Sequence, residues 1–328
     1  MRVYRIERRA RVGGKPCGAV HRWPLHFAGE GRSGGNEGRN CDQGGGSRRL
    51  RMDGGGGYSA LRLRRWKYVR CSAEADARSD SGGGEAKDVR AHRLAGGKAA
   101  VGHDAEEIAT MRAAAALGCR LFEGMLATMQ PGMAETAVAA ELEHAARMAG
   151  AEAMSFPTIV ASGERSSLPH GNATAAKLPR RGFVTLDFGV VLDGYCSDMT
   201  RTIHMGPARA GERNAYDAVL EAQEAGVAAV RAGVSGGDVD EAARGVLRKA
   251  GLADWFTHST GHGVGLEIHE GPRLAAKQTQ ILEAGMVITI EPGIYRPGKF
   301  GVRIEDMVLV TARGGEILTP ATKAWIEL

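Results

Sequence analysis

Cysteine is scarce in this chain, and its placement suggests no covalent framework. Only five cysteines occur in 328 residues: Cys17, Cys41, Cys71, Cys119 and Cys196. An odd number without paired spacing argues against a disulfide scaffold or a structural zinc knot. We therefore expect a reducing, cytoplasmic setting.

Long apolar runs are also absent from the sequence. The chain opens with Arg2, Arg5, Arg8 and Arg9, but no apolar run of signal-peptide length follows them. No stretch is long enough to cross a bilayer. The sequence thus predicts a protein that is neither secreted nor inserted in a membrane.

Residues 1–102 lack sustained hydrophobic periodicity. Residues 1–100 contain 22 Lys and Arg against 10 Asp and Glu, a net charge of +12, and the remaining residues contain 21 against 28, a net charge of −7. A basic segment rich in Gly and Arg cannot bury enough apolar surface to offset its ordering entropy. We expect residues 1–102 to be disordered, or translated in the wrong frame or from a misplaced start. A nucleic-acid-binding tail is the less favoured alternative.

From Asp104 onward the sequence predicts pairs of helices followed by strands. Asp104 and Glu107 have the spacing of a capping box. An apolar stripe then marks a helix that a turn at residues 130–132 ends; the stripe is Ile108, Met111, Ala115, Phe122 and Met125. The other expected elements are helices over 136–148, 212–231 and 238–250, a strand over 154–161, a hairpin over 182–204 around Asp193-Gly194, and strands near 286–291 and 302–311.

A faint internal repeat accompanies this order of elements. A shift of 101 residues places Gly132 on Gly233, Val138 on Val239, Arg147 on Arg248 and Ala149-Gly150 on Ala250-Gly251. With two helices followed by strands occurring twice, the repeat predicts two related α/β halves within one domain over residues 103–328. The interface between such halves is a common place for a site.

Acidic residues occur inside or beside the apolar strands. Asp187 follows Thr185-Leu186, and Glu291 follows the apolar residues 287–290. Acids in such places are rarely buried unless they are paired or bound to a cation. A salt bridge would explain one of them, but a shared cation is the economical explanation for Asp187, Asp198, Glu291 and Glu305 together with His262.

The stretch from His258 to Arg273 contains His258, His262 and His269 among glycines. Each histidine alone could be a satisfied loop residue. Glycines at positions 261, 263 and 265 disfavour a helix, so we expect them to let the chain turn until the three histidines reach one pocket.

Residues 104–328 resemble the catalytic domain of the pita-bread metallopeptidases. This family includes methionine aminopeptidases, Xaa-Pro aminopeptidases and Xaa-Pro dipeptidases, with creatinase as a non-peptidase relative. The matching motifs occur in the family's order: PHG (169–171), LDFG (186–189), SDMTR (197–201), GHGVGLEIHEGPR (261–273), IEPG (290–293) and RIED (303–306). The resemblance implies an α+β pita-bread fold of two pseudo-symmetric halves.

The resemblance also implies a site with two divalent metal ions. The family's five ligands fall on Asp187, Asp198, His262, Glu291 and Glu305. Asp198 and Glu305 would bridge the ions, Asp187 would complete one, and His262 with Glu291 the other, so that a metal-bridging hydroxide attacks the substrate. Manganese or cobalt is favoured over zinc or iron.

Further site residues follow from the same resemblance. His170 and His269 would lie beside the scissile carbonyl, and Glu291 would carry a proton to the leaving amine. His258 matches a further substrate-facing histidine of the proline-directed members. Arg303 matches an arginine that orders the site.

The motifs SDMTRT and GHGVGLEIHEGPR are more similar to Xaa-Pro peptidases than to methionine aminopeptidases. We expect a metallo-exopeptidase that removes the N-terminal residue of a peptide or dipeptide where proline follows, with peptides as partners and a homodimer as one possible assembly. The alternatives are methionine aminopeptidase-type specificity and a metal-free binding module. Proline-directed members carry an extra N-terminal α/β domain, whose place residues 1–102 take here, so pocket closure and assembly remain open.

Overall fold

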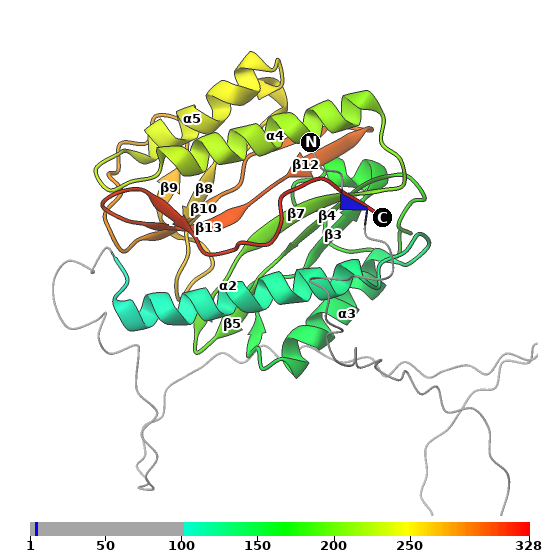
Figure 1. Ribbon diagram of the computed structural model, residues 1–328, viewed down its shortest axis with the longest axis horizontal. Coiled ribbons are helices and arrows are strands. Elements are labelled where there is room, and N and C mark those ends of the chain that lie inside the picture. Colours follow the sequence, from blue (N-terminus) through cyan, green and yellow to red (C-terminus); the bar gives the residue numbers. More distant parts are fainter. Residues whose placement is uncertain (1–3, 6–101) are drawn as a thin grey trace, which may run out of the picture. The chain divides into compact units, whose positions relative to one another are not determined.

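The computed structural model describes residues 4–5 and 102–328 (Figure 1). The expectations for residues 1–102 lie outside the described residues, with one exception. Tyr4–Arg5 forms strand β1, which pairs in parallel with β15 (Ile326–Glu327). No described helix is long and apolar enough to span a membrane.

The helices follow the expected order and nearly the expected bounds. In the described residues they are α2 (Ala105–Leu126), α3 (Glu135–Met148), α4 (Ala210–Ala229) and α5 (Gly236–Lys249), with short 3-10 helices η1 (Gly163–Ser167) and η2 (Ala253–Trp255). The capping box is confirmed, because Asp104 accepts from the backbone of Glu107 at 2.9 Å and Glu107 accepts from that of Asp104 at 2.8 Å.

The first half contains a five-stranded sheet of order β1-β15-β7-β4-β3. Its longest strands are β4 (Gly182–Phe188) and β7 (Met199–Met205), and β3 (Ile159–Ser162) is an edge strand beside β4. β4 and β7 pair antiparallel over their whole length. The hairpin between them continues as β5 (Val190–Leu192) and β6 (Tyr195–Cys196), which meet at Asp193-Gly194. Both turn residues have positive φ, as a two-residue hairpin turn requires, so the predicted hairpin is confirmed.

The second half contains an antiparallel sheet of order β14-β13-β10-β8-β9. Its strands are β8 (Gly261–Gly263), β9 (Glu270–Leu274), β10 (Val287–Ile290), β13 (Asp306–Val310) and β14 (Gly315–Ile317). In Figure 1 the strands lie between α4 and α5 on one side and α2 and α3 on the other. This is the expected arrangement of two α/β halves.

Two expected strands are each divided in the structure. The segment 302–311 forms β12 (Phe300–Arg303), which pairs with β11 (Gly293–Arg296), and then β13, which pairs with β10. Glu305 lies between β12 and β13, where the partner strand changes from β11 to β10. The apolar pattern of the sequence continues across this point. The segment 154–161 likewise divides into β2 (Ala153–Met154), paired with β5, and β3.

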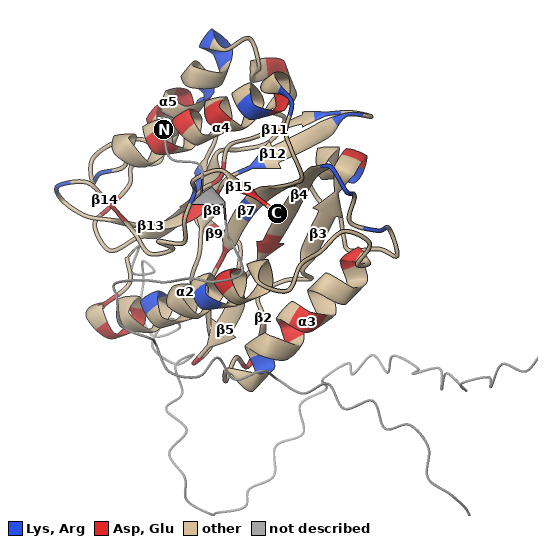
Figure 2. Ribbon diagram, turned by 45° about the vertical axis from the view of Figure 1, so that its right-hand side comes forward, with Lys and Arg blue, Asp and Glu red and all other residues tan. Residues whose placement is uncertain are grey.

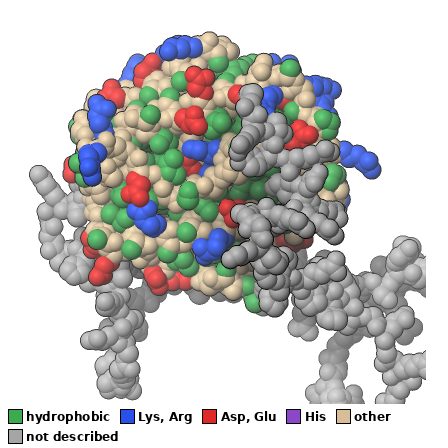
Figure 3. Space-filling model, in the orientation of Figure 1, with side chains coloured by type: hydrophobic (Ala, Val, Ile, Leu, Met, Phe, Trp, Pro, Cys, Tyr) green, Lys and Arg blue, Asp and Glu red, His purple; other side chains and the backbone are tan. Residues whose placement is uncertain are grey.

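The core lies between the sheets and the helices. α2 and α3 bury Phe122 and Leu142 against Leu186 and Met205 of the first sheet. Charged residues gather on the helices, whereas the strands are mostly uncharged (Figure 2). On the face drawn in Figure 3, acidic and basic side chains are interspersed. Six charged residues on or beside the described strands are nevertheless buried: Asp187, Asp198, Arg201, Arg303, Glu305 and Asp306.

Candidate active site

One pocket of about 600 Å³ opens where the two sheets meet. All nine residues that the sequence marks as site candidates line it: His170, Asp187, Asp198, His258, His262, His269, Glu291, Arg303 and Glu305. Its walls also include Phe156, Pro157, Ile159 and Ile268. The pocket lining is therefore partly acidic and partly apolar.

The four acids come from equivalent places in the two halves. Asp187 lies near the end of β4, and Glu291 directly follows β10. Asp198 directly precedes β7, and Glu305 directly precedes β13. Because β4 pairs with β7 and β10 with β13, each antiparallel pair brings its two acids to the same end of its sheet.

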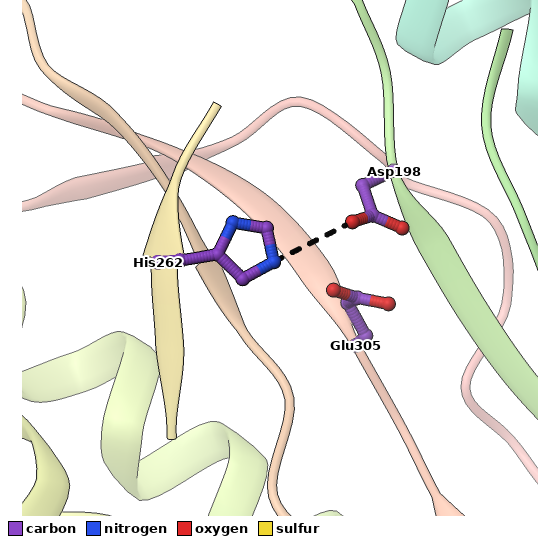
Figure 4. Close-up of side chains that lie close together, drawn as sticks. All are labelled: Asp198, His262 and Glu305. Atoms are coloured by element: carbon purple, nitrogen blue, oxygen red, sulfur yellow. Dashed lines mark ion pairs between the residues drawn. The ribbon is translucent and has the colours of Figure 1, made fainter. Parts of the chain in front are cut away.

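Asp198, His262 and Glu305 form the centre of the site (Figure 4). One ligand atom from each lies within 4.8 Å of the others. Nε2 of His262 is 3.7 Å from Oδ2 of Asp198 and 3.6 Å from Oε1 of Glu291. The fourth acid, Asp187, lies in the same pocket but accepts a hydrogen bond from Nη2 of Arg303.

The crowded acids hold their protons more strongly than ordinary carboxyl groups do. Burial, and next the charge of Glu305, raises the pKa of Asp198 and that of Glu291 well above their usual range. Burial, and next the charge of Asp187, raises the pKa of Glu305 to about 8. Several ionised carboxylates buried this close together are unfavourable because they repel one another and have lost hydration. Bound cations would offset that free-energy cost.

His262 presents a bare ring nitrogen to the acids. Its Nδ1 lies 3.0 Å from the carbonyl oxygen of Gly263, which can only accept, so Nδ1 donates. Burial lowers the pKa of His262 to about 4, so Nε2 keeps its lone pair at neutral pH. A lone pair facing two carboxylates repels them unless a cation lies between.

Two buried acid oxygens support the same conclusion. Oδ1 of Asp187 and Oδ1 of Asp198 have no hydrogen-bond partner among the described residues. Buried polar atoms are rarely left unpaired in proteins. Hard carboxylate oxygens and one imidazole are a donor set that suits divalent ions such as manganese, so these residues fit a metal centre.

His258 lines the pocket, but both of its ring nitrogens are engaged. Nδ1 lies 2.8 Å from the carbonyl oxygen of Ser259, and Nε2 lies 2.9 Å from the hydroxyl of Tyr295. Arg303 donates to the same hydroxyl at 2.6 Å, so the hydroxyl donates its own hydrogen to His258. Burial lowers the pKa of His258 to about 4. The ring is therefore neutral and orders Tyr295 and Arg303.

Sequence reasoning missed Tyr295 and Thr200. Thr200 donates to Glu305 at 2.6 Å and accepts from Nε of Arg303 at 3.0 Å. Strand spacing gave a signal for Thr200, which follows Asp198 by two positions, because side chains two apart share a face. Tyr295 lies near Arg303 because β11 pairs with β12, and spacing in the sequence does not give that pairing.

The glycines around His262 do more than allow the expected turn. Gly261, Gly263 and Gly265 do not have positive φ, and the first two lie in strand β8. A Cβ would lie 1.9 Å from the Thr289 carbonyl oxygen at Gly261 and 2.2 Å from the Gly271 carbonyl oxygen at Gly263. The chain does turn between β8 and its antiparallel partner β9, through a segment of bends that begins at Gly265. Gly261 and Gly263 have a second effect, because they let neighbouring strands approach closely.

His269 and His170 are exposed on the pocket wall. The His269 ring packs edge-on against His262, with centroids 4.5 Å apart. His170 lies in the loop after β3, which bridges back to that strand through Asn172 and Ile159. The three histidines of the 258–273 stretch thus do reach one pocket, with different neighbours.

The fold and the acidic pocket define a metallopeptidase domain with the pita-bread architecture. A family model described as Metallopeptidase family M24 matches residues 109–312. The chain belongs to this family.

Two peptidases with similar sequences agree with that membership. An Xaa-Pro dipeptidase of Pyrococcus furiosus is 44% identical over 214 residues, covering 65% of this chain and 62% of the relative. An uncharacterized peptidase, YqhT, of Bacillus subtilis is 45% identical, covering 68% and 63%. The chain therefore spans less than two thirds of the length of these relatives.

Solved structures show the same fold. An Xaa-Pro dipeptidase from Bacillus anthracis superposes with a TM-score of 0.69 at 46% identity, covering 70% of this chain and 64% of that one. A prolidase from Pyrococcus furiosus gives a TM-score of 0.67 at 42% identity, covering 68% and 66%. The predicted fold class is confirmed.

Proposed function

We propose that this chain is a metal-dependent exopeptidase that hydrolyses the N-terminal peptide bond of Xaa-Pro peptides or dipeptides. The observation that carries the proposal is the buried group of Asp198, His262 and Glu305, with Asp187 and Glu291 beside it, in one open pocket. The names of the relatives support a peptidase, and two of them specify Xaa-Pro dipeptides.

Five side chains would hold two divalent ions. Asp198 and Glu305 would bridge the ions, and the others would complete them: Asp187 on one side, His262 and Glu291 on the other. Ions bound there supply Lewis acidity toward the scissile carbonyl and lower the pKa of the attacking water. Manganese or cobalt belongs to the same proposal, supported by the carboxylate-rich donor set.

The other pocket residues would bind the peptide and move protons. His170 and His269 have exposed rings on the pocket wall, where they can donate to the oxygen of the reacting carbonyl. Glu291 would carry a proton from water to the leaving amine. His258 would act through Tyr295, which holds Arg303 against Asp187.

The pocket has two surfaces that would suit the proline residue of an Xaa-Pro dipeptide. Phe156, Pro157 and Ile159 form an apolar wall on which a proline ring could pack. Arg273 lines the same pocket and has no ion-pair partner among the described residues. A dipeptide carries its free carboxylate on the residue after the cut, so a nearby guanidinium would favour short substrates.

A peptide-library digest tests the proposal directly. Protein loaded with manganese or cobalt should release the N-terminal residue from Xaa-Pro peptides, and a chelator should abolish the release. Release from Met-X peptides instead would support methionine aminopeptidase-type specificity. If the metal-loaded protein hydrolyses no peptide, the proposal of an enzyme is refuted, and the alternative of a binding module is supported.

Setting and assembly are part of the proposal as well. Cys119 and Cys196 are free and buried thiols, which is consistent with the cytoplasmic setting that we propose. A homodimer stays a prediction, for which the oligomeric state in solution is the test.

A further inference from the structure

We propose that Glu135 is a positioning residue that fixes the loop carrying His170, and thereby sets the approach of His170 to the substrate. The inference rests on the proposed peptidase function, since it concerns the wall of the same pocket. Glu135 lies at the start of α3, outside the pocket, and its side chain is fully buried.

The Glu135 carboxylate accepts hydrogen bonds from both sides of the loop. Ser162, the last residue of β3, donates from its backbone N and from Oγ, each at 2.9 Å. Thr174 donates from its backbone N at 3.1 Å and from Oγ1 at 2.8 Å. Arg165 of η1 donates from Nε at 3.1 Å. One charge therefore closes the segment 162–174 into a loop, with His170 between the anchors.

The charge of Glu135 also reaches the residues next to His170. Arg165, paired with Glu135, donates from Nη2 to the carbonyl oxygen of Asn172 at 2.8 Å. Asn172 donates its backbone N–H to the carbonyl oxygen of His170 at 2.9 Å. A short chain of bonds thus runs from the buried carboxylate to the backbone of His170.

Little else fixes the His170 ring. Its side chain has no hydrogen bond or ion pair to another described residue, so the ring lies where the loop backbone places it. The loop pairs with β3 through the single bridge between Asn172 and Ile159. On the pocket side, Arg303 donates to the carbonyl oxygen of Pro169 at 3.1 Å. Glu135 and Arg303 hold the loop from opposite sides.

A double-mutant cycle tests this role in the full-length, metal-loaded chain. Glu135→Gln keeps the shape of the side chain but removes its charge, and should lower kcat/KM for an Xaa-Pro dipeptide about tenfold, mainly through kcat, because His170 would donate to the reacting carbonyl. In a His170→Ala background the same change should have less than about a twofold effect, because the group that it positions is gone. Metal content should stay at the wild-type level. Glu141→Gln, an exposed position on the same helix, is the matched control.

Hydrogen exchange provides a readout that needs no activity. Without substrate, amides of residues 163–174 should exchange faster in Glu135→Gln than in wild type or in Glu141→Gln. Thr174→Val removes one donor and leaves the carboxylate in place, so it should give a smaller change in the same amides even if Glu135→Gln folds poorly.

Two results would overturn the inference. The first is the same loss of kcat/KM in both backgrounds, which would mean a general structural role. The second is unchanged exchange of residues 163–174 in both variants. An inactive wild-type protein would instead refute the proposed function, and the exchange measurement would still decide whether Glu135 holds the loop.

Discussion

The two halves of the domain contribute to the pocket from equivalent places, yet unequally. Each half offers one acid at the end of a strand and one acid just before that strand's antiparallel partner: Asp187 and Asp198 in the first, Glu291 and Glu305 in the second. The neighbouring strands differ. β8 carries His262, whereas β3, in the same place beside β4, carries Ile159 and Val160.

This difference gives the pocket two distinct sides. In the metal centre that we propose, the symmetric acids would share ions between the halves, and the imidazole of His262 would add a ligand on the second side alone. Ile159 lines the pocket, so the first half offers an apolar surface where the second offers a histidine. We infer that the symmetry serves the metal centre and the asymmetry serves the orientation of the substrate.

The two sheets also differ in what supports the pocket histidine at their outer edge. β9 pairs with β8 as a five-residue strand that begins directly after His269. The corresponding loop after β3 has the single bridge at Asn172, two residues after His170. A backbone ladder therefore supports His269, whereas the side chain of Glu135 supports the loop of His170.

A buried acid also supports the second half, where it acts on the segment that leads into β8. Asp240 of α5 accepts from Oγ1 of Thr260 at 2.7 Å and pairs with Arg244, which donates to the carbonyl oxygen of His258. Both halves thus use an acid from their second helix to hold the chain beside the pocket histidines.

The largest loss of activity should come from substitution of Asp198 and Glu305, the acids that occupy equivalent places in the two halves. Asp198→Asn and Glu305→Gln should each lower kcat/KM by about a hundredfold or more and reduce bound metal, because each removes a carboxylate charge that we propose as a bridge between the ions. His269→Ala should lower the rate but keep the metal. Metal analysis beside steady-state kinetics checks the three variants. Equal metal loss in all three would mean that ligands and proton-handling groups are wrongly divided between these residues.

The metal-free protein should lose stability as pH rises from about 6.5 to 8. Burial raises the pKa of Glu305 to about 8 from its usual value of 4.5. An acid whose pKa is raised by folding stabilises the fold below its unfolded pKa, and that stability disappears as pH rises toward the folded pKa. His258 and His262 have pKa values lowered to about 4, so both stay neutral above about pH 6.5 and add no slope there.

Thermal unfolding measures this pH dependence. We expect the Tm of metal-free protein to fall by roughly 5 °C across that interval, given about 1.4 kcal/mol per proton per pH unit. Bound metal should remove the slope, and Glu305→Gln should reduce it. A Tm that stays level or rises in the metal-free protein would contradict the raised pKa of the buried acids.

Local signals in the sequence predicted most of the fold. The Asp104 and Glu107 capping box and the Asp193-Gly194 turn both depend on neighbours within a few residues, and both are confirmed. The division of residues 302–311 at Glu305 was not predictable, because it depends on a change of partner strand.

The four acids could be found because acids are exceptional inside or beside apolar strands, whereas the roles of His170, His258, His269 and Arg303 came from the resemblance to the family. The supporting residues could not be found in the same way. Glu135, in the first turn of its helix, and Asp240, two residues after Asp238, are ordinary acids for the start of a helix in sequence terms. Their burial and their hydrogen-bond partners depend on loops that are distant in the sequence. A sequence pattern does not show that these loops lie close to the two acids in space.

The central claim, a two-ion centre assembled from both halves, is tested most directly by metal stoichiometry. Protein saturated with manganese and freed of excess metal should contain two ions per chain by mass spectrometry, and His262→Ala, which alters the second half alone, should contain fewer. One ion or none in the wild-type chain, or an unchanged count in His262→Ala, would contradict the account.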